Sequence, residues 1–181
     1  TSDLNWGVNT KKLIKEANKR MQFLHKAKKF TNNREDLKKI YMLQVRSKLD
    51  QSAVVWHSGL TVKNRNDLER VQKAALRVIL GEKYISYENA LSVMKIESLE
   101  KRRQNLCLKF AKQCTRNEKL KNMFPKNKKD HSMKKRSGEK FVVRKACTER
   151  YRRSAIPNMQ RLLNNSEKEK IETFKKIENT V

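Results

Sequence analysis

The stretch Asp67 to Gly81, which reads DLERVQKAALRVILG, constrains the fold of this chain more than any other. Its apolar residues recur at spacings of three and four, which places them on one stripe of an α-helix. These residues are Leu68, Val71, Ala75, Val78 and Ile79. Asn66 is the expected N-cap, with Glu69 as its capping-box partner. Gly81 is expected to end the helix, because glycine adopts a positive φ without strain. The stretch therefore predicts a core helix.

Four other stretches carry the same helical periodicity, at about residues 11–29, 34–56, 87–94 and 99–115. The side chains expected to cap them are Asn9 or Thr10, Asn33, Ser86 and Ser98. The chain has only 4 Gly and 2 Pro, fewer turn residues than a long all-β architecture needs. We therefore predict an all-α fold, a small helical bundle over residues 1–115, with short connections between antiparallel neighbours.

The composition changes near residue 117, after which basic residues dominate. From Pro125 to Arg153 there are 12 Lys or Arg against three acids. We predict a basic linker over 116–140, partly disordered, and a C-terminal extension with short helices over 141–181. Within this extension Phe141 begins a short extended segment, Ile156 before Pro157 is expected to be non-helical, and the last residues form a frayed helix.

The charge balance predicts a polyanionic partner, because 45 Lys and Arg exceed 19 Asp and Glu by +26. Nucleic acid is the expected partner, bound through its phosphates with no sequence readout. The candidate phosphate-binding residues are Lys11, Lys15, Lys19, Arg70, Lys73, Arg77, Arg102, Arg103, Lys134, Lys135, Arg136, Arg144, Arg152 and Arg153. Two hypotheses stay open for Phe141 and Tyr151: they stack on unpaired bases between these arginines, or Phe141 and its neighbours dock on the helical domain.

Other chemistry finds little support in the sequence. Cys107 and Cys114 are seven residues apart on one predicted helix and read as core thiols, with no Cys-x-x-Cys or Cys-His cluster for a metal. No phosphate-cradling glycine loop or nucleophile–base pair is present, so we expect neither a cofactor nor catalytic residues. With no secretory signal or membrane-length apolar run, we predict an intracellular protein with no membrane partner. A start at Thr1 suggests a fragment or a processed piece.

Five segments, in this order, resemble the region that follows the polymerase palm in reverse transcriptases of jockey-like non-LTR retrotransposons. They read SDLNWGVNTKKLIKEANKRMQFL, KIYMLQVRSKLDQSAVVWHSGL, ERVQKAALRVILG, ALSVMKIESLEKRRQNLCLKFAKQ and ERYRRSAIPNMQRLLN. The resemblance covers about Ser2 to Asn164. It implies a thumb-like bundle, the thumb and C-terminal segment of an RNA-directed DNA polymerase. In that family the thumb grips the RNA template and the growing DNA, and the work is nuclear.

The chain also departs from that family. It lacks the palm with its metal-binding aspartates, the endonuclease domain and any cysteine–histidine knuckle. Relatives carry Tyr-Ala before the Val-Trp step, where this chain has Gln51-Ser52-Ala53. No catalytic residue is carried over. We expect no enzyme activity from the chain alone, whereas the parent polymerase would need Mg²⁺.

Two alternatives stay open beside this interpretation. The chain could be a stand-alone basic helical protein that binds anionic partners without catalysis. It could also be an enzyme fragment that becomes active only with a separate palm.

Overall fold

The computed structural model describes residues 6–126, 140–143 and 145–178, with only the backbone at 168 and 170–178. The described chain is helical, and its one β feature is an isolated antiparallel bridge between Lys126 and Phe141. The prediction of an all-α helical bundle is therefore confirmed. The chain divides into two compact units between Arg103 and Gln104, inside a helix and before the predicted boundary at residue 115.

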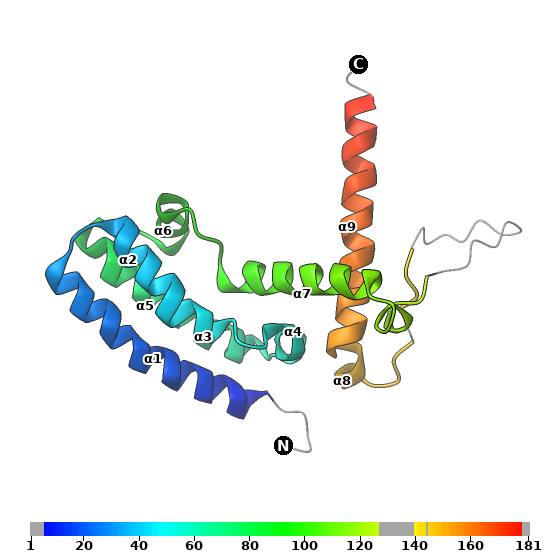
Figure 1. Cartoon of the computed structure of the whole chain (residues 1–181), viewed down its shortest axis with the longest axis horizontal. Helices are drawn as coiled ribbons and strands as arrows, with labels where there is room; N and C mark the ends of the chain where they lie inside the picture. The colour runs from blue at the N-terminus through cyan, green and yellow to red at the C-terminus, as the bar shows by residue number, and fades with distance from the viewer. Residues whose placement is uncertain (1–5, 127–139, 144, 179–181) are drawn as a thin grey trace, which may run out of the picture. The chain divides into compact units, whose positions relative to one another are not determined.

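The N-terminal unit holds most of the helices (Figure 1). Its elements are α1 (Gly7–Phe30), α2 (Arg34–Ile40), the π-helical η1 (Tyr41–Arg46), α3 (Ser47–Leu49), α4 (Ala53–Trp56), the 3-10 turn η2 (His57–Gly59), α5 (Val62–Leu80), the 3-10 turn η3 (Gly81–Lys83), α6 (Tyr87–Met94) and the first residues of α7 (Leu99–Arg116). Figure 1 shows α1 beside α2, α3 and α5, and all three of these helices contact α1.

Several predicted helix ends are confirmed. Asn33 and Ser86 cap α2 and α6, accepting hydrogen bonds from Glu35 N and Asn89 N. The Ser98 hydroxyl accepts from Lys101 N at 3.3 Å, in the first turn of α7. Gly81 ends α5 with φ 57°, the conformation for which glycine is suited. Short polar side chains thus set these boundaries as the sequence predicts.

Two predicted helix starts are wrong. α1 begins at Gly7, and neither Asn9 nor Thr10 caps it; the Thr10 hydroxyl instead donates to Trp6 O at 2.8 Å. α5 begins at Val62 with Thr61 as its N-cap, so Asn66 lies inside the helix. Both helices start about one turn earlier than predicted. For α5 the reason is that Thr61 and Asn66 are both cap-type residues in one polar lead-in, and the earlier one forms the cap.

The predicted single helix over 34–56 is also wrong. Its ladder widens to π-helical spacing in η1 and then breaks between α3 and α4. At the break Ser52 adopts a left-handed φ of 53°, and the Trp56 indole donates to Gln51 O at 2.8 Å. A left-handed residue cannot continue a right-handed helix, so α4 turns away from α3.

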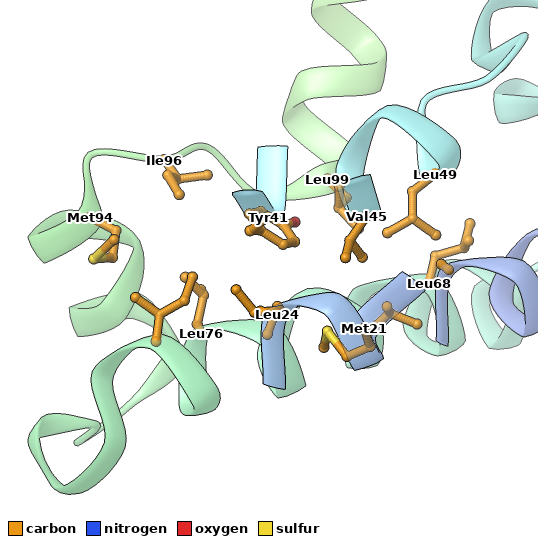
Figure 2. Close-up of a cluster of buried hydrophobic side chains, with 14 of the residues drawn as sticks. Met21, Leu24, Tyr41, Val45, Leu49, Leu68, Leu76, Met94, Ile96 and Leu99 are labelled. Atoms are coloured by element: carbon orange, nitrogen blue, oxygen red, sulfur yellow. The ribbon is translucent and has the colours of Figure 1, made fainter. Parts of the chain in front are cut away.

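The hydrophobic core of the N-terminal unit lies between α1, α2, η1, α5 and α6 (Figure 2). Leu24, Tyr41 and Leu76 are each 0% exposed there. The apolar stripes predicted on 11–29 and 67–81 are buried as expected, and Val78 is half-buried. Helical periodicity therefore identified the inward faces of the two longest helices in this unit.

The C-terminal unit contains the rest of α7, η4 (Lys121–Met123), α8 (Glu149–Arg152) and α9 (Ala155–Glu178). α9 contradicts the expected non-helical step, because Ile156 is helical. Pro157 is the third residue of that helix, where a missing N–H removes no intrahelical bond. On the part of α7 that belongs to this unit, from Gln104 onward, the buried residues are Cys107, Ala111 and Cys114, whereas Phe110 is exposed.

Phe141 docks inside the C-terminal unit. Its side chain is 5% exposed. Its backbone N donates to Asn164 Oδ1 at 2.9 Å, and its carbonyl accepts from Asn164 Nδ2 at 3.0 Å. The burial of Phe141 therefore excludes base stacking by that ring, and its hydrogen bonds join it to α9 of its own unit. Docking on the helical domain over residues 1–115 stays a prediction.

Candidate nucleic-acid interface

An open groove of about 860 Å³ runs between α1 and α5 on the N-terminal unit. Ten residues line it: Lys11, Ile14, Lys15, Asn18, Lys19, Gln22, Asp67, Arg70, Val71 and Ala74. Four of them, Lys11, Lys15, Lys19 and Arg70, are among the phosphate-binding residues predicted from the sequence. We call this lining the α1–α5 groove.

The α1 wall of the groove presents three lysines at a spacing of four residues. Lys11, Lys15 and Lys19 are all exposed, and the helical rise separates neighbours by about 6 Å along the axis. Leu13 and Ala17 turn the opposite face of α1 into the core. Burial of that face therefore fixes the direction in which the lysine row points.

The α5 wall contributes Arg70 and one acid, Asp67. The Arg70 guanidinium lies 3.1 Å from Asp67 Oδ1, and 78% of its side chain is exposed. An exposed pair three residues apart contributes well under about 1 kcal/mol, so it does not hold Arg70 away from a phosphate. Ile14, Val71 and Ala74 supply the apolar part of the lining between the two walls.

Lys73 and Arg77 lie on α5 but outside the groove lining. The Lys73 ammonium sits 4.9 Å from the centre of the Tyr87 ring, and the Arg77 guanidinium 5.3 Å from that of Tyr84. These are cation–π contacts with α6 and the link that precedes it. They bind the two cations to the protein's own aromatic rings.

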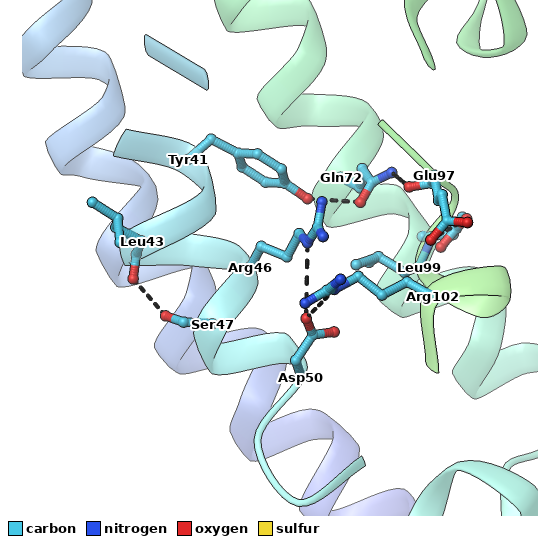
Figure 3. A network of polar contacts seen from close by, with 10 residues as sticks. Tyr41, Leu43, Arg46, Ser47, Asp50, Gln72, Glu97, Leu99 and Arg102 are labelled. Carbon is cyan, nitrogen blue, oxygen red and sulfur yellow. Dashed lines mark hydrogen bonds and ion pairs between the residues drawn. The ribbon is translucent and has the colours of Figure 1, made fainter. Parts of the chain in front are cut away.

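Arg102 belongs to a largely buried polar network (Figure 3). Arg102 Nε lies 2.7 Å from Asp50 Oδ2, and Arg46 Nε lies 3.8 Å from the same oxygen. Beside these ion pairs, Figure 3 shows the hydrogen bond in which the Tyr41 hydroxyl donates to Gln72 Oε1 at 2.7 Å. Arg102 therefore neutralises an internal carboxylate and is a poor candidate for a phosphate.

The prediction that Arg103 binds phosphate is wrong. Its side chain is 0% exposed, it donates from Nε to His57 Nδ1 at 3.4 Å, and its guanidinium lies 5.8 Å from the Trp56 ring centre. Its two terminal nitrogens have no hydrogen-bond partner in the part of the chain described. A residue with no exposed surface cannot reach a phosphate, so Arg103 is removed from the candidate interface.

His57 beside it is 3% exposed. Desolvation by burial, and then the nearby charges of Arg103 and Arg65, lower the pKa of His57 to about 4. The imidazole is therefore neutral at physiological pH, which keeps Nδ1 able to accept from Arg103.

Arg152 and Arg153 are the two candidate phosphate-binding residues of the C-terminal unit that the structure describes. Arg152 and Arg153 each place Nε 2.7 Å from a carboxylate oxygen of Glu149. These hydrogen bonds lower the pKa of Glu149. The other four nominated residues, Lys134, Lys135, Arg136 and Arg144, lie outside the described residues.

Three further observations concern the described residues as a whole. No group of three or more His, Cys, Asp or Glu that would hold a metal occurs among the described residues. Within the same residues, no helix has the length and apolar content to cross a membrane. Cys107, Cys114 and Cys147 are free thiols, of which the last is exposed.

Sequence reasoning missed Asn18 and Gln22, which line the groove beside the lysines. Their positions, seven and eleven residues after Lys11, lie on the same side of a helix, so the signal was present. Their neutral amides also donate hydrogen bonds to phosphate and sugar oxygens, though more weakly than charged groups do. The chain matches no protein-family model, no curated protein and no solved structure.

Proposed function

We propose that this chain binds nucleic acid through the phosphate backbone, with the α1–α5 groove as its main contact. The observation that carries the proposal is the convergence of Lys11, Lys15, Lys19 and Arg70 on one groove. A net charge of +26 supports long-range attraction to a polyanion. The family resemblance supports the finer proposal, that the chain serves as thumb and C-terminal segment of a reverse transcriptase and grips an RNA–DNA hybrid.

The chemistry of the groove supports binding without base recognition. Ammonium groups are point charges that accept any phosphate orientation, and they release counterions when they bind. Asn18 and Gln22 add neutral donors that can contact phosphate and sugar oxygens, while Ile14, Val71 and Ala74 carry no polar side-chain group. In the parent polymerase, the palm would supply the carboxylates that hold Mg²⁺, and this chain would position the duplex.

The test is the affinity for an RNA–DNA hybrid duplex of a variant carrying Lys11→Gln, Lys15→Gln and Lys19→Gln. We expect a loss of at least about tenfold, because three phosphate contacts disappear. The matched control carries Lys63→Gln, Lys83→Gln and Lys101→Gln. These lysines are exposed and outside the groove, so the control removes the same charge.

Equal losses in the two variants would show that only net charge matters, and would refute the groove as the contact surface. Absence of binding by the unaltered chain at low salt would refute the proposal altogether. Equal affinity for the hybrid and for polyglutamate would favour the stand-alone protein that binds acidic partners.

A further inference from the structure

A second pocket lies on the other flank of α1. It has a volume of about 370 Å³ and is lined by Trp6, Asn9, Lys12, Leu13, Glu16, Lys48, Gln51, Ser52, Val55 and Trp56. We call it the Trp6 pocket. The α1 residues that face it are at 9, 12, 13 and 16, whereas those that face the α1–α5 groove are at 11, 14, 15, 18, 19 and 22. One helix therefore separates the two sites.

The Trp6 pocket combines aromatic and apolar walls with a few polar groups. Trp6 is partly buried, Trp56 is 2% exposed, and Val55 is 52% exposed at the surface. Asn9, Gln51 and Ser52 bring side-chain donors and acceptors. This composition, in a pocket of this volume, is typical of small-molecule sites, and the two indoles favour a planar group, because aromatic rings stack.

Two structural constraints hold the pocket in shape. A Cβ added at Gly59 would lie 2.7 Å from Cδ1 of Trp6, so the indole packs directly against the backbone of that glycine. Ser52 on the wall adopts the left-handed φ of 53°. Such backbone strain in a residue other than glycine concentrates at binding sites, where the surrounding structure enforces it.

The cations around the pocket indicate the charge of the molecule that would carry the planar group. Lys12 is exposed at the rim. Lys48 is held by Glu16 at 2.7 Å, so its charge is already balanced. Lys12 follows Lys11 of the groove directly, and the body of a helix is only about 10–12 Å across. A strand whose phosphates contact the lysine row would therefore have to cross only the width of α1 to reach the Trp6 pocket.

We propose that the Trp6 pocket takes one unpaired nucleobase of the strand that the α1–α5 groove holds, stacked against the Trp6 indole with Lys12 on its phosphate. This inference rests on the proposed function and extends it from duplex phosphates to an unpaired segment of the same nucleic acid. Stacking tolerates every base, because every base has a π-face, so it agrees with a surface that does not read sequence.

The test compares two probes of about ten nucleotides, an oligothymidylate and an abasic oligomer with the same phosphates. We expect the unaltered chain to bind the thymidine oligomer about 5- to 150-fold more tightly than the abasic one. Trp6→Ala should abolish that preference and leave abasic binding and its salt dependence unchanged. Phe30→Ala is the matched control, because Phe30 is 90% exposed on α1 and outside the pocket.

A measurement on the unaltered chain covers the case in which Trp6→Ala fails to fold. The chain has two tryptophans, and Trp56 is 2% exposed with its indole N–H bonded. Stacking should quench the fluorescence of Trp6 with the thymidine oligomer and not with the abasic one. Equal affinity for the two probes, with no base-dependent quenching, would overturn the inference and leave the proposed function intact. Failure to bind either probe would count against both.

Discussion

Removal of the Asp50 carboxylate should destabilise the N-terminal unit strongly. Asp50 Oδ2 receives Arg46 at 3.8 Å and Arg102 at 2.7 Å, and the side chains of Arg46 and Asp50 are only 9% and 13% exposed. Burial lowers the pKa of Arg46, a sign that its charge is already costly to keep in this position. Asp50→Ala would leave two guanidinium groups facing each other without their shared anion.

The expected loss of unfolding free energy follows from how far solvent reaches the ion-paired side chains. Breaking a buried ion pair by removing one partner costs about 3–5 kcal/mol. Arg102 is 34% exposed, so solvent screens its share, and we take the lower end, about 3 kcal/mol. With a urea m-value of about 2 kcal/mol per molar, this lowers the unfolding midpoint by about 1.5 M. Tryptophan fluorescence reports the N-terminal unit, since Trp6 and Trp56 both belong to it.

The control is Glu100→Ala, which removes an exposed partner of Arg65 at 3.0 Å and should cost less than about 1 kcal/mol. A midpoint for Asp50→Ala equal to that of the control would refute the reasoning, because it would show that water screens Asp50 fully. Replacing Arg46, Asp50 and Arg102 together by Met, Leu and Met should be much less destabilising than Asp50→Ala, since no buried charge is then left unpaired.

Two further predictions concern pH and backbone strain. The folded-state pKa of His57 is about 4, against 6.5 in the unfolded chain. The contribution of neutral His57 to the unfolding free energy is therefore complete above pH 6.5. About 3 kcal/mol of it is lost as the pH falls toward 4. His57→Gln should therefore flatten the fall in unfolding free energy over that window, and identical pH profiles would contradict this. Lys95 is the C-cap of α6 and adopts a left-handed φ of 51°. Lys95→Gly should therefore raise the unfolding free energy by about 0.5–1 kcal/mol in a urea titration, because glycine adopts this φ without strain. A lower unfolding midpoint would show instead that the Lys95 side chain stabilises the turn.

Much of the fold was predictable because local periodicity and capping act over a few residues. Leu68 and Ala75 fell on the stripe that is buried, and Asn33 and Ser86 cap the helices that follow them. The break at Ser52 was not predictable, because it depends on how Trp56 packs in the core and bonds back to Gln51. Such tertiary contacts override local helical preference.

The candidate site was predictable only in part. The spacing of Lys11, Lys15 and Lys19 placed them on one face of a helix, but their meeting with Arg70 depends on which helices pack together, and no local signal encodes that. Arg103 shows the opposite error. Its residue type favoured the surface, whereas its spacing of four from Leu99 favoured the core, and the core position is the one observed.

The dependence on salt of the affinity for an RNA–DNA hybrid tests the central claim most directly. Between about 50 and 200 mM salt, log K should fall linearly with log salt, with a slope of about −0.9 for each phosphate bound. The substitution of Lys11, Lys15 and Lys19 by Gln should reduce the size of that slope by about 2.7, while the control with Lys63, Lys83 and Lys101 replaced keeps it. A flat salt response, or one slope shared by both variants, would contradict phosphate binding in the α1–α5 groove.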